Sequence, residues 1–172
     1  MAVLYETPRL VVRELDDDDA DALYELHRHA AVMDWLKSPP SSGPDEERER
    51  IAQWRSRGWP PGYGFHAMVE RETQRLVGLV VLKPFDDRPY LDLGWRLHPG
   101  AQGRGYATEA ARGAIEYAVN TLGRNASEVA AVTLPDNVRS RAVMERLGMT
   151  FAGDTVHAGL PHVLYLLVPP AH

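Results

Sequence analysis

Cysteine is absent from this sequence of 172 residues. Its absence excludes disulfide bonds, Cys-ligated zinc, iron–sulfur clusters and any mechanism built on a thiol nucleophile. Long hydrophobic runs are also missing, because the longest, Leu76–Leu82, is far shorter than the roughly 20 residues of a membrane helix. Met1–Leu10 lacks a basic region followed by an apolar stretch, so we expect a cytoplasmic protein with no membrane partner.

Positive charge is also limited, and the formal net charge is −5. A broad basic face for nucleic acid is therefore not expected. The chain length suits one hydrophobic core, so we expect residues 1–172 to form a single domain that acts as a monomer or a homodimer.

Hydrophobic periodicity predicts an alternation of strands and helices. Helix starts are expected at Asp16, which can cap the acidic turn after it, and at Gly43. A further helix over about 105–122 carries an alanine-rich stripe suited to close packing on a sheet. The expected strands are Leu4–Leu15, a hairpin of Phe65–Val69 and Leu76–Leu82, then Tyr90–Leu97, Val129–Leu134, Thr150–His157 and His162–Val168. This order predicts an α/β fold with a mixed sheet of about seven strands and about four helices.

The segment most informative about chemistry is Tyr90–Ala111, where a strand leads through a glycine-rich turn into a helix. Glycines let backbone N–H groups approach a ligand, and a helix start adds unpaired donors and partial positive charge. Arg104 in the turn can donate two hydrogen bonds to a phosphate, so the turn is consistent with a diphosphate site. The sequence has no P-loop motif, and the dinucleotide fingerprint fails at Thr108. A plain strand-to-helix loop is the alternative.

Three sequence blocks resemble the GCN5-related N-acetyltransferase (GNAT) family. Gln102–Ala107 (QGRGYA) is similar to its Q/R-x-x-G-x-G/A signature, and Thr108–Ala110 (TEA) extends the match to ribosomal-protein alanine and serine acetyltransferases. Thr7–Arg13 (TPRLVVR) resembles the opening of that branch, T-x-R-L-x-L-R. Pro135–Met149 resembles its closing PxNxxSxxVxEKLGF. The three blocks occur in the family's order and span nearly the whole chain.

The resemblance implies an α/β acyl-CoA N-acyltransferase fold, with the sheet splayed between its fourth and fifth strands. Here those strands would be Tyr90–Leu97 and Val129–Leu134, and acetyl-CoA would enter between them as cosubstrate. The residues that the resemblance assigns to acetyl-CoA binding are Leu97, His98, Gln102, Gly103, Arg104, Gly105, Tyr106, Ala107, Thr108, Asn137 and Ser140. Asn137 and Ser140 have alternative roles, as a helix cap and as a solvated helix residue respectively.

The implied reaction is acetyl transfer to a primary amine. An acetyl-cysteine intermediate cannot form without cysteine, so we expect direct attack in a ternary complex. Met144 stands where many family members have a tyrosine acid. Asp92 is the leading candidate for general base and Ser140 for a hydroxyl near the thiol, although Asp92 also fits an outward-facing strand residue. His66 is an alternative base or a packed histidine.

The acceptor implied by the branch is the α-amine of a protein N-terminus, with a small amine such as a polyamine, an antibiotic or a metabolite as the alternative. The alternative functions are a non-catalytic acyl-CoA sensor and a dinucleotide-binding module. Aromatic residues near the expected helices line an acceptor pocket or pack in the core: Trp35, Trp54, Trp59 and Tyr63. No metal is expected, because the pair His27 and His29 has no evident third ligand and does not share a helix face.

Overall fold

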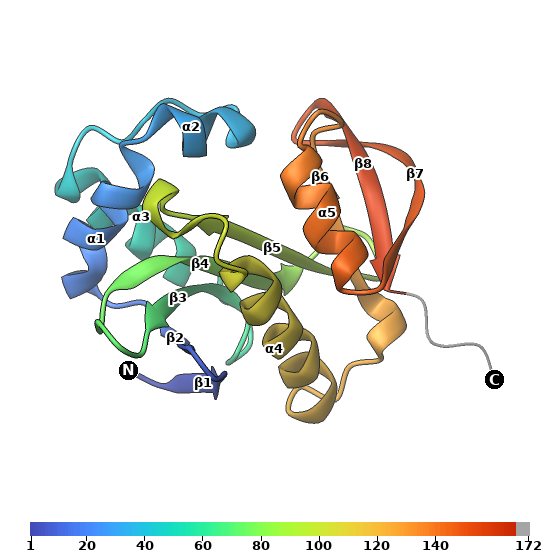
Figure 1. Ribbon diagram of the computed structural model, residues 1–172, viewed down its shortest axis with the longest axis horizontal. Helices are drawn as coiled ribbons and strands as arrows, with labels where there is room; N and C mark the ends of the chain where they lie inside the picture. The colour runs from blue at the N-terminus through green and yellow to red at the C-terminus, as the bar shows by residue number, and fades with distance from the viewer. Residues whose placement is uncertain (168–172) are drawn as a thin grey trace.

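The protein is described here for residues 1–167 in a computed structural model, which contains one mixed sheet flanked by helices (Figure 1). The strands are β1 (Val3–Glu6), β2 (Leu10–Glu14), β3 (Gly64–Glu70), β4 (Leu76–Pro84), β5 (Leu91–Leu97), β6 (Val129–Thr133), β7 (Met149–His157) and β8 (Leu160–Leu167). The helices are α1 (Ala20–His27), α2 (Ala30–Met33), α3 (Pro44–Arg55), α4 (Tyr106–Asn120) and α5 (Val138–Arg146), with short 3-10 turns between several elements. This architecture confirms the expected α/β fold.

The eight strands follow the order β1-β2-β3-β4-β5-β6-β8-β7. Strands β3 and β4 form the expected hairpin, with the polar turn between Glu70 and Leu76. Every neighbouring pair is antiparallel except β5 and β6, which are parallel. A parallel pair needs a crossover, and α4 supplies it.

The segment Leu4–Leu15 forms two antiparallel strands where the hydrophobic pattern predicts one. The chain reverses after Glu6, in a turn where the Thr7 N–H donates to Leu10 O at 2.9 Å. Pro8 lies in this turn, has no N–H to donate to a ladder and so favours the reversal. The extra strand raises the expected count of about seven to eight.

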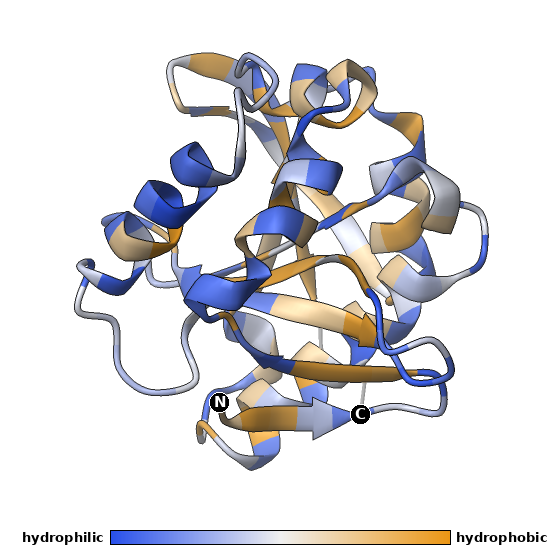
Figure 2. Ribbon diagram, turned by 90° about the vertical axis from the view of Figure 1, so that its left-hand side faces the viewer, coloured by the Kyte–Doolittle hydropathy of each residue, from blue (hydrophilic) through white to orange (hydrophobic). Residues whose placement is uncertain are grey.

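Helices cover both faces of the sheet. One hydrophobic cluster joins α1 and α3 to the sheet through Leu23, Leu26 and Ile51. The other joins α4 and α5 to the opposite face through the alanines of α4 and Met144 of α5. Figure 2 shows hydrophobic colour concentrated on the strands between these layers. The small alanine side chains let the α4 backbone approach β4 and β5 closely.

The sheet opens where β5 and β6 diverge, a place we call the fork. Only Leu91 with Val129 and Asp92 with Ala130 are paired between these strands. Beyond Asp92, the edge of β5 that faces β6 has no strand partner, although β4 continues to pair with β5 as far as Leu97. Backbone N–H and C=O groups on that edge therefore remain available to a ligand. The sequence-based expectation of a splay between these two strands is confirmed.

One carboxylate fastens the N-terminal turn to α4. Glu109 accepts hydrogen bonds from Thr7 Oγ1 at 2.6 Å, Arg9 N at 2.9 Å and Arg9 Nε at 2.7 Å. Burial acts to raise the pKa of Glu109, but the hydrogen bonds from Thr7 and Arg9 outweigh it and lower the pKa. The first turns of α4 are thereby held against β1 and β2.

We predict that Glu109→Gln lowers the free energy of unfolding by about 1.5–3 kcal/mol at neutral pH, because hydrogen bonds to a charged carboxylate are lost. The folded-state pKa is depressed, so the carboxylate's contribution is complete above about pH 4.3 and is lost as the pH falls through the folded pKa. Urea denaturation at several pH values measures the difference. Glu116→Gln, an exposed position on the same helix, is the control. Equal stability of the two variants at neutral pH would contradict the prediction.

Candidate functional site

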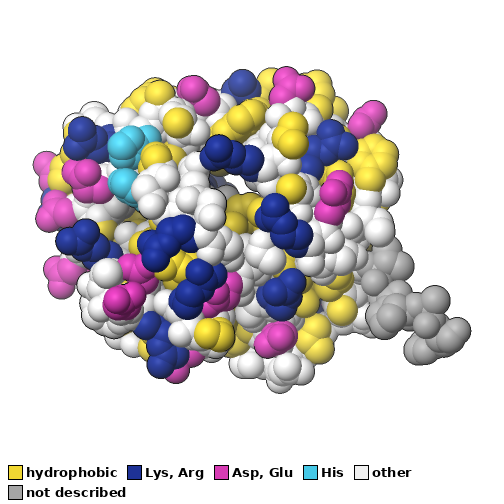
Figure 3. Space-filling view, viewed as in Figure 1, with side chains coloured by type: hydrophobic (Ala, Val, Ile, Leu, Met, Phe, Trp, Pro, Cys, Tyr) yellow, Lys and Arg dark blue, Asp and Glu magenta, His cyan; other side chains and the backbone are white. Residues whose placement is uncertain are grey.

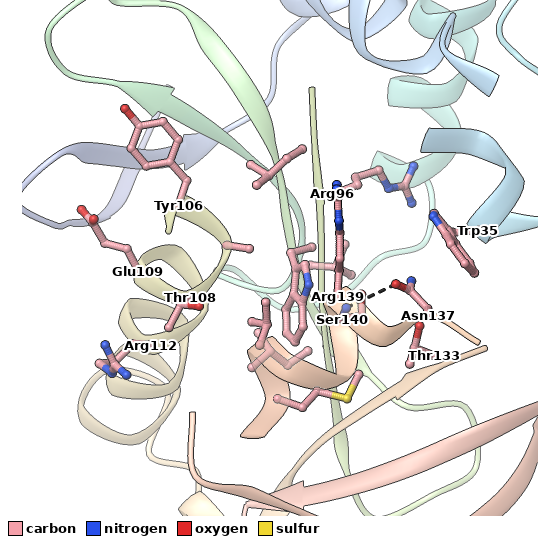
Figure 4. Close-up of a pocket in the computed structure, with 18 of the residues that line it drawn as sticks. Trp35, Arg96, Tyr106, Thr108, Glu109, Arg112, Thr133, Asn137, Arg139 and Ser140 are labelled. Carbon is pink, nitrogen blue, oxygen red and sulfur yellow. Dashed lines mark hydrogen bonds between the residues drawn. The ribbon is translucent and has the colours of Figure 1, made fainter. Parts of the chain in front are cut away.

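A cavity of about 1890 Å³ runs along the fork. Its walls come from β5, from the length of α4, from β1 and the turn after it, from the start of α5 and from the 3-10 turn Asp34–Leu36 that follows α2. In Figure 4, α4 lies on one side of the cavity, while Trp35 and Arg96 lie on the other. The cavity therefore connects both faces of the sheet through the gap between β5 and β6.

The N-terminus of α4 has the features of an anion site. Gly103 and Gly105 have φ angles of 78° and 80°, which glycine adopts without strain. Gly105 is the N-cap residue, and no side chain caps the helix. Because the first N–H groups of a helix have no partner within it, this end of α4 presents free donors and partial positive charge to the cavity.

The structure brings most of the predicted cofactor residues together at this cavity. Those that line it are Leu97, Gln102, Gly103, Gly105, Tyr106, Ala107, Thr108, Asn137 and Ser140. His98 does not line it; its Nδ1 accepts a hydrogen bond from Gly100 N at 3.0 Å, and its ring meets His29 edge-on. The glycine turn and the start of α5, which are distant in sequence, thus form opposite walls of one site.

Arg104 lies differently from the sequence-based expectation. Its Nη1 is 3.0 Å from Glu70 Oε1, and its side chain is half-exposed outside the main cavity. Tyr106 is buried, and its hydroxyl donates to the same carboxylate oxygen of Glu70. The Tyr106 and Glu109 side chains point away from α5 (Figure 4). In this arrangement the Arg104 side chain lies outside the cavity, while Gly103 and Gly105 on either side of it line the cavity.

The start of α5 forms the facing wall. Asn137 is its N-cap residue, and its side-chain oxygen accepts from Ser140 N at 3.2 Å (Figure 4). The predicted capping role of Asn137 is confirmed. Arg139 Nη1 donates to Gln102 Oε1 at 2.7 Å, which links α5 to the turn before α4 across the cavity mouth.

Asp92 lies at the apex of the fork, as the last β5 residue that pairs with β6. Its side chain is nearly buried, lines the cavity and lies 3.1 Å from Lys83 Nζ on the neighbouring strand. Asp92, Gly94 and Arg96 alternate with Leu91, Leu93 and Trp95, which pack towards α4. The first three therefore share the opposite face of β5, which we call the acceptor face.

The aromatic residues divide between cavity and core. Trp35 lines the cavity, with 45% of its surface exposed. Trp54 stacks on Phe65 with ring centroids 4.0 Å apart, and Trp59 lies 6.1 Å from the same ring. Phe65 also lines the cavity, so Trp54 packs behind one of the cavity's walls. Tyr63 packs against the core on the α4 side.

Several cavity residues were not singled out from the sequence. Lys83, Phe65 and Arg96 are the chief examples. Arg96 lies in a largely apolar strand whose one other charged residue is Asp92, and a charge in such a strand is a usable signal, because it requires a partner. That partner is His27, whose Nε2 lies 3.0 Å from Arg96 Nη1.

The family model for the acetyltransferase (GNAT) domain matches residues 9–150. The chain belongs to the GNAT acetyltransferase family. The N-acetyltransferase YnaD of Bacillus subtilis is 30% identical over 148 residues, which cover 86% of this chain and 82% of YnaD. This GNAT chain is thus an acetyl-transferring enzyme of a family that uses acetyl-CoA.

Solved structures agree with the fold of this GNAT domain. A GNAT-family acetyltransferase from Bacillus anthracis gives a TM-score of 0.81 at 21% identity, covering 98% of each chain. The ribosomal-protein acetyltransferase RimL, solved in complex with coenzyme A, gives a TM-score of 0.74 at 17% identity, covering 96% of this chain and 97% of RimL.

The surface of this GNAT domain is basic around the cavity, although the whole chain is acidic. Figure 3 shows Lys and Arg side chains gathered around a hollow near the middle of one face. Arg9, Lys37, Arg112 and Arg139 are among the residues that line the cavity. Positive charge around a glycine turn and an uncapped helix start suits a phosphate-bearing cosubstrate.

No helix within residues 1–167 is long and apolar enough to cross a bilayer. In the same part of the chain, no group of three or more His, Asp or Glu side chains is arranged to hold a metal ion.

His66 does not line the cavity, so its geometry favours a packed histidine over a base. Burial lowers the pKa of His66 to about 4. The folded state disfavours the charged ring, so the neutral His66 costs no stability above about pH 6.5. As the pH falls from there to about 4, the unfolded chain binds a proton at His66 that the folded state does not, and the free energy of unfolding decreases.

We predict that His66→Leu preserves acetyl transfer and removes a pH-dependent loss of stability of about 3 kcal/mol between pH 6.5 and 4. Chemical denaturation across that range, compared with the wild type, measures the loss. A His66→Leu variant that folds but no longer transfers acetyl would show that His66 takes part in the reaction.

Proposed function

We propose that the chain transfers the acetyl group of acetyl-CoA directly to a primary amine within a ternary complex. The observation that carries the proposal is the fork itself, with an uncapped, glycine-led helix N-terminus at one end and a carboxylate at its apex. One end suits the pyrophosphate and the other suits the reacting amine. The gap between them gives an extended pantetheine arm an edge of β5 to pair with.

The residues predicted from the sequence to bind acetyl-CoA supply the cosubstrate end of the fork. In this proposal, backbone N–H groups of the turn 102–107 and the first turn of α4 bind the pyrophosphate. Leu97, the last residue of β5, and His98 after it contact the upper pantetheine arm, and backbone groups of β5 nearer to Asp92 polarise the thioester carbonyl. Asn137 and Ser140 contact the pantetheine arm and the sulfur region from the facing wall.

The transfer step needs no covalent enzyme intermediate. The amine nitrogen attacks the thioester carbonyl carbon, the C–S bond breaks, and coenzyme A leaves as a thiolate. The amine proton passes to Asp92, directly or through a water, and then to solvent. Met144 is buried at the position of the family's tyrosine, so the thiolate leaves without a side-chain acid there.

The acceptor that we favour is the α-amine of a polypeptide N-terminus, because the TEA and PxNxxS blocks resemble the branch that acts on ribosomal proteins. A small amine is the second candidate. The aromatic and aliphatic wall formed by Trp35, Phe65 and Val81 favours it, because such a wall encloses a compact ligand. We further propose that the reaction takes place in the cytoplasm.

We predict that Gly105→Glu abolishes measurable binding of coenzyme A in calorimetry, because it adds bulk and negative charge where the pyrophosphate binds. The matched control is Gly123→Glu just after α4, where the glycine also has a positive φ of 67° and open space around it. Both substitutions carry similar backbone strain, so the control separates misfolding from loss of the site. Retained coenzyme A affinity in folded Gly105→Glu would locate the site elsewhere.

We predict that Asp92→Asn lowers turnover near neutral pH by about 10²–10⁴-fold, the usual contribution of a general base. The loss shrinks as the pH rises, because more of the amine is already deprotonated. The variant also leaves Lys83 without its carboxylate partner. The double variant Lys83→Met/Asp92→Asn separates these effects: recovery of turnover would assign the loss to the unpaired ammonium and remove Asp92 as the base.

A further inference from the structure

A fully buried acid–base pair lies between α1 and α3, behind the acceptor face. His27 Nδ1 is 2.9 Å from Glu47 Oε2, and neither side chain is exposed. Arg50 Nε lies 3.1 Å from the same oxygen of Glu47. Such a pair is costly to bury, and the steps described above do not use it.

The hydrogen-bond pattern assigns the tautomer of His27. Burial lowers the pKa of His27 even though the hydrogen bond to Glu47 opposes this effect, so the ring is neutral. Its Nδ1–H donates to Glu47, which leaves Nε2 as an acceptor for Arg96 Nη1 at 3.0 Å. A neutral imidazole thus connects the Arg96 guanidinium to a carboxylate and holds it in one orientation.

Arg96 has a positive charge without a carboxylate in direct contact. Among residues 1–167, no Asp or Glu oxygen forms an ion pair with its guanidinium, and Phe65 lies 5.5 Å below it. Burial lowers the pKa of Arg96 to about 10, so it remains protonated at neutral pH. Arg96 lines the cavity beside Trp35 (Figure 4). Its remaining N–H groups are suited to a planar anion.

The acceptor face places opposite charges on either side of a glycine. Asp92, Gly94 and Arg96 occupy alternate positions on one face of β5, and Gly94 lies opposite Val81. The first and last Cα atoms are about 13 Å apart at the usual strand rise. His27 and Phe65 hold the Arg96 guanidinium on this face. Gly94, between the two charges, adds no side chain.

We propose that Arg96 binds a carboxylate of the acceptor, and that the acceptor is a primary amine with a carboxylate close to it. Two sources share this chemistry: a free amino acid, and a polypeptide whose first residues are acidic. Asp92 then lies at the amine end and Arg96 at the carboxylate end. The assignment rests on the proposed acetyl transfer, with Arg96 as its specificity-determining residue and His27 and Glu47 as positioning residues.

The test uses matched acceptors and measures the release of coenzyme A thiol. One arm compares each common L-amino acid with its carboxamide, and a second compares peptides that begin with Asp or Glu with those that begin with Asn or Gln. We expect kcat/KM for the carboxylate member to exceed that for the amide by at least about tenfold in one arm, as for a charge-assisted hydrogen bond. In the amino-acid arm, the amine of the carboxamide is less basic, so more of it is deprotonated at neutral pH. This difference favours the amide and therefore cannot produce the expected preference for the carboxylate.

Arg96→Gln is the diagnostic variant, and Arg48→Gln is its control. Arg48 is an exposed arginine on α3 that pairs with Asp45, outside the site. We expect Arg96→Gln to lower kcat/KM about 10- to 100-fold for the carboxylate acceptor and much less for its amide, with coenzyme A affinity unchanged. Arg48→Gln should change none of these values.

Two results would overturn the assignment. One is an equal fall for both members of a pair in Arg96→Gln, and the other is a wild-type enzyme that prefers amides or polyamines. The wild-type comparison requires no variant, so it stands even if Arg96→Gln fails to fold. If the wild-type protein neither binds coenzyme A nor transfers acetyl to any acceptor, the proposed function itself is refuted.

Discussion

The incomplete pairing of β5 with β6 is the constraint on which the rest of the structure depends. After two residue pairs the strands separate, and the sheet acquires an internal edge. An internal edge is costly for a fold unless something pairs with it, because its backbone donors and acceptors face no strand. Here the edge opens into a cavity whose ends differ in charge and chemistry, so it is suited to an extended ligand.

The surrounding layers keep the fork open. The alanines of α4 pack against one side of the sheet, and α5 contributes Met144 to the same core cluster. On the other face, α1 and α3 bring His27 and Glu47 behind the acceptor face, where they orient Arg96. Glu109 joins the N-terminal turn to α4, which fixes the helix whose first turn faces the cavity. Each layer thus contributes to packing and to the position of a group at the site.

Local sequence signals predicted much of this arrangement, and long-range contacts account for what they missed. The turn at 102–107 was predictable because glycine spacing and helix capping act over a few residues. The side-chain position of Arg104 was not, because its partner Glu70 comes from a separate strand. The role of Arg96 likewise depends on a distant residue, since His27 lies 69 positions away. The prediction of one strand over Leu4–Leu15 is wrong, because the polar segment Glu6–Arg9, with Pro8, reverses the chain and lets β1 pair with β2.

The most direct measurement of the central claim is a crystal structure of the protein with acetyl-CoA bound. We expect the pantetheine arm to lie between β5 and β6 beyond Asp92, paired with the open edge of β5, and the pyrophosphate to accept hydrogen bonds from backbone N–H groups at the start of α4. Acetyl-CoA bound away from the fork, or strands β5 and β6 paired along their full lengths with the cavity closed, would contradict the claim that the fork is the cosubstrate site.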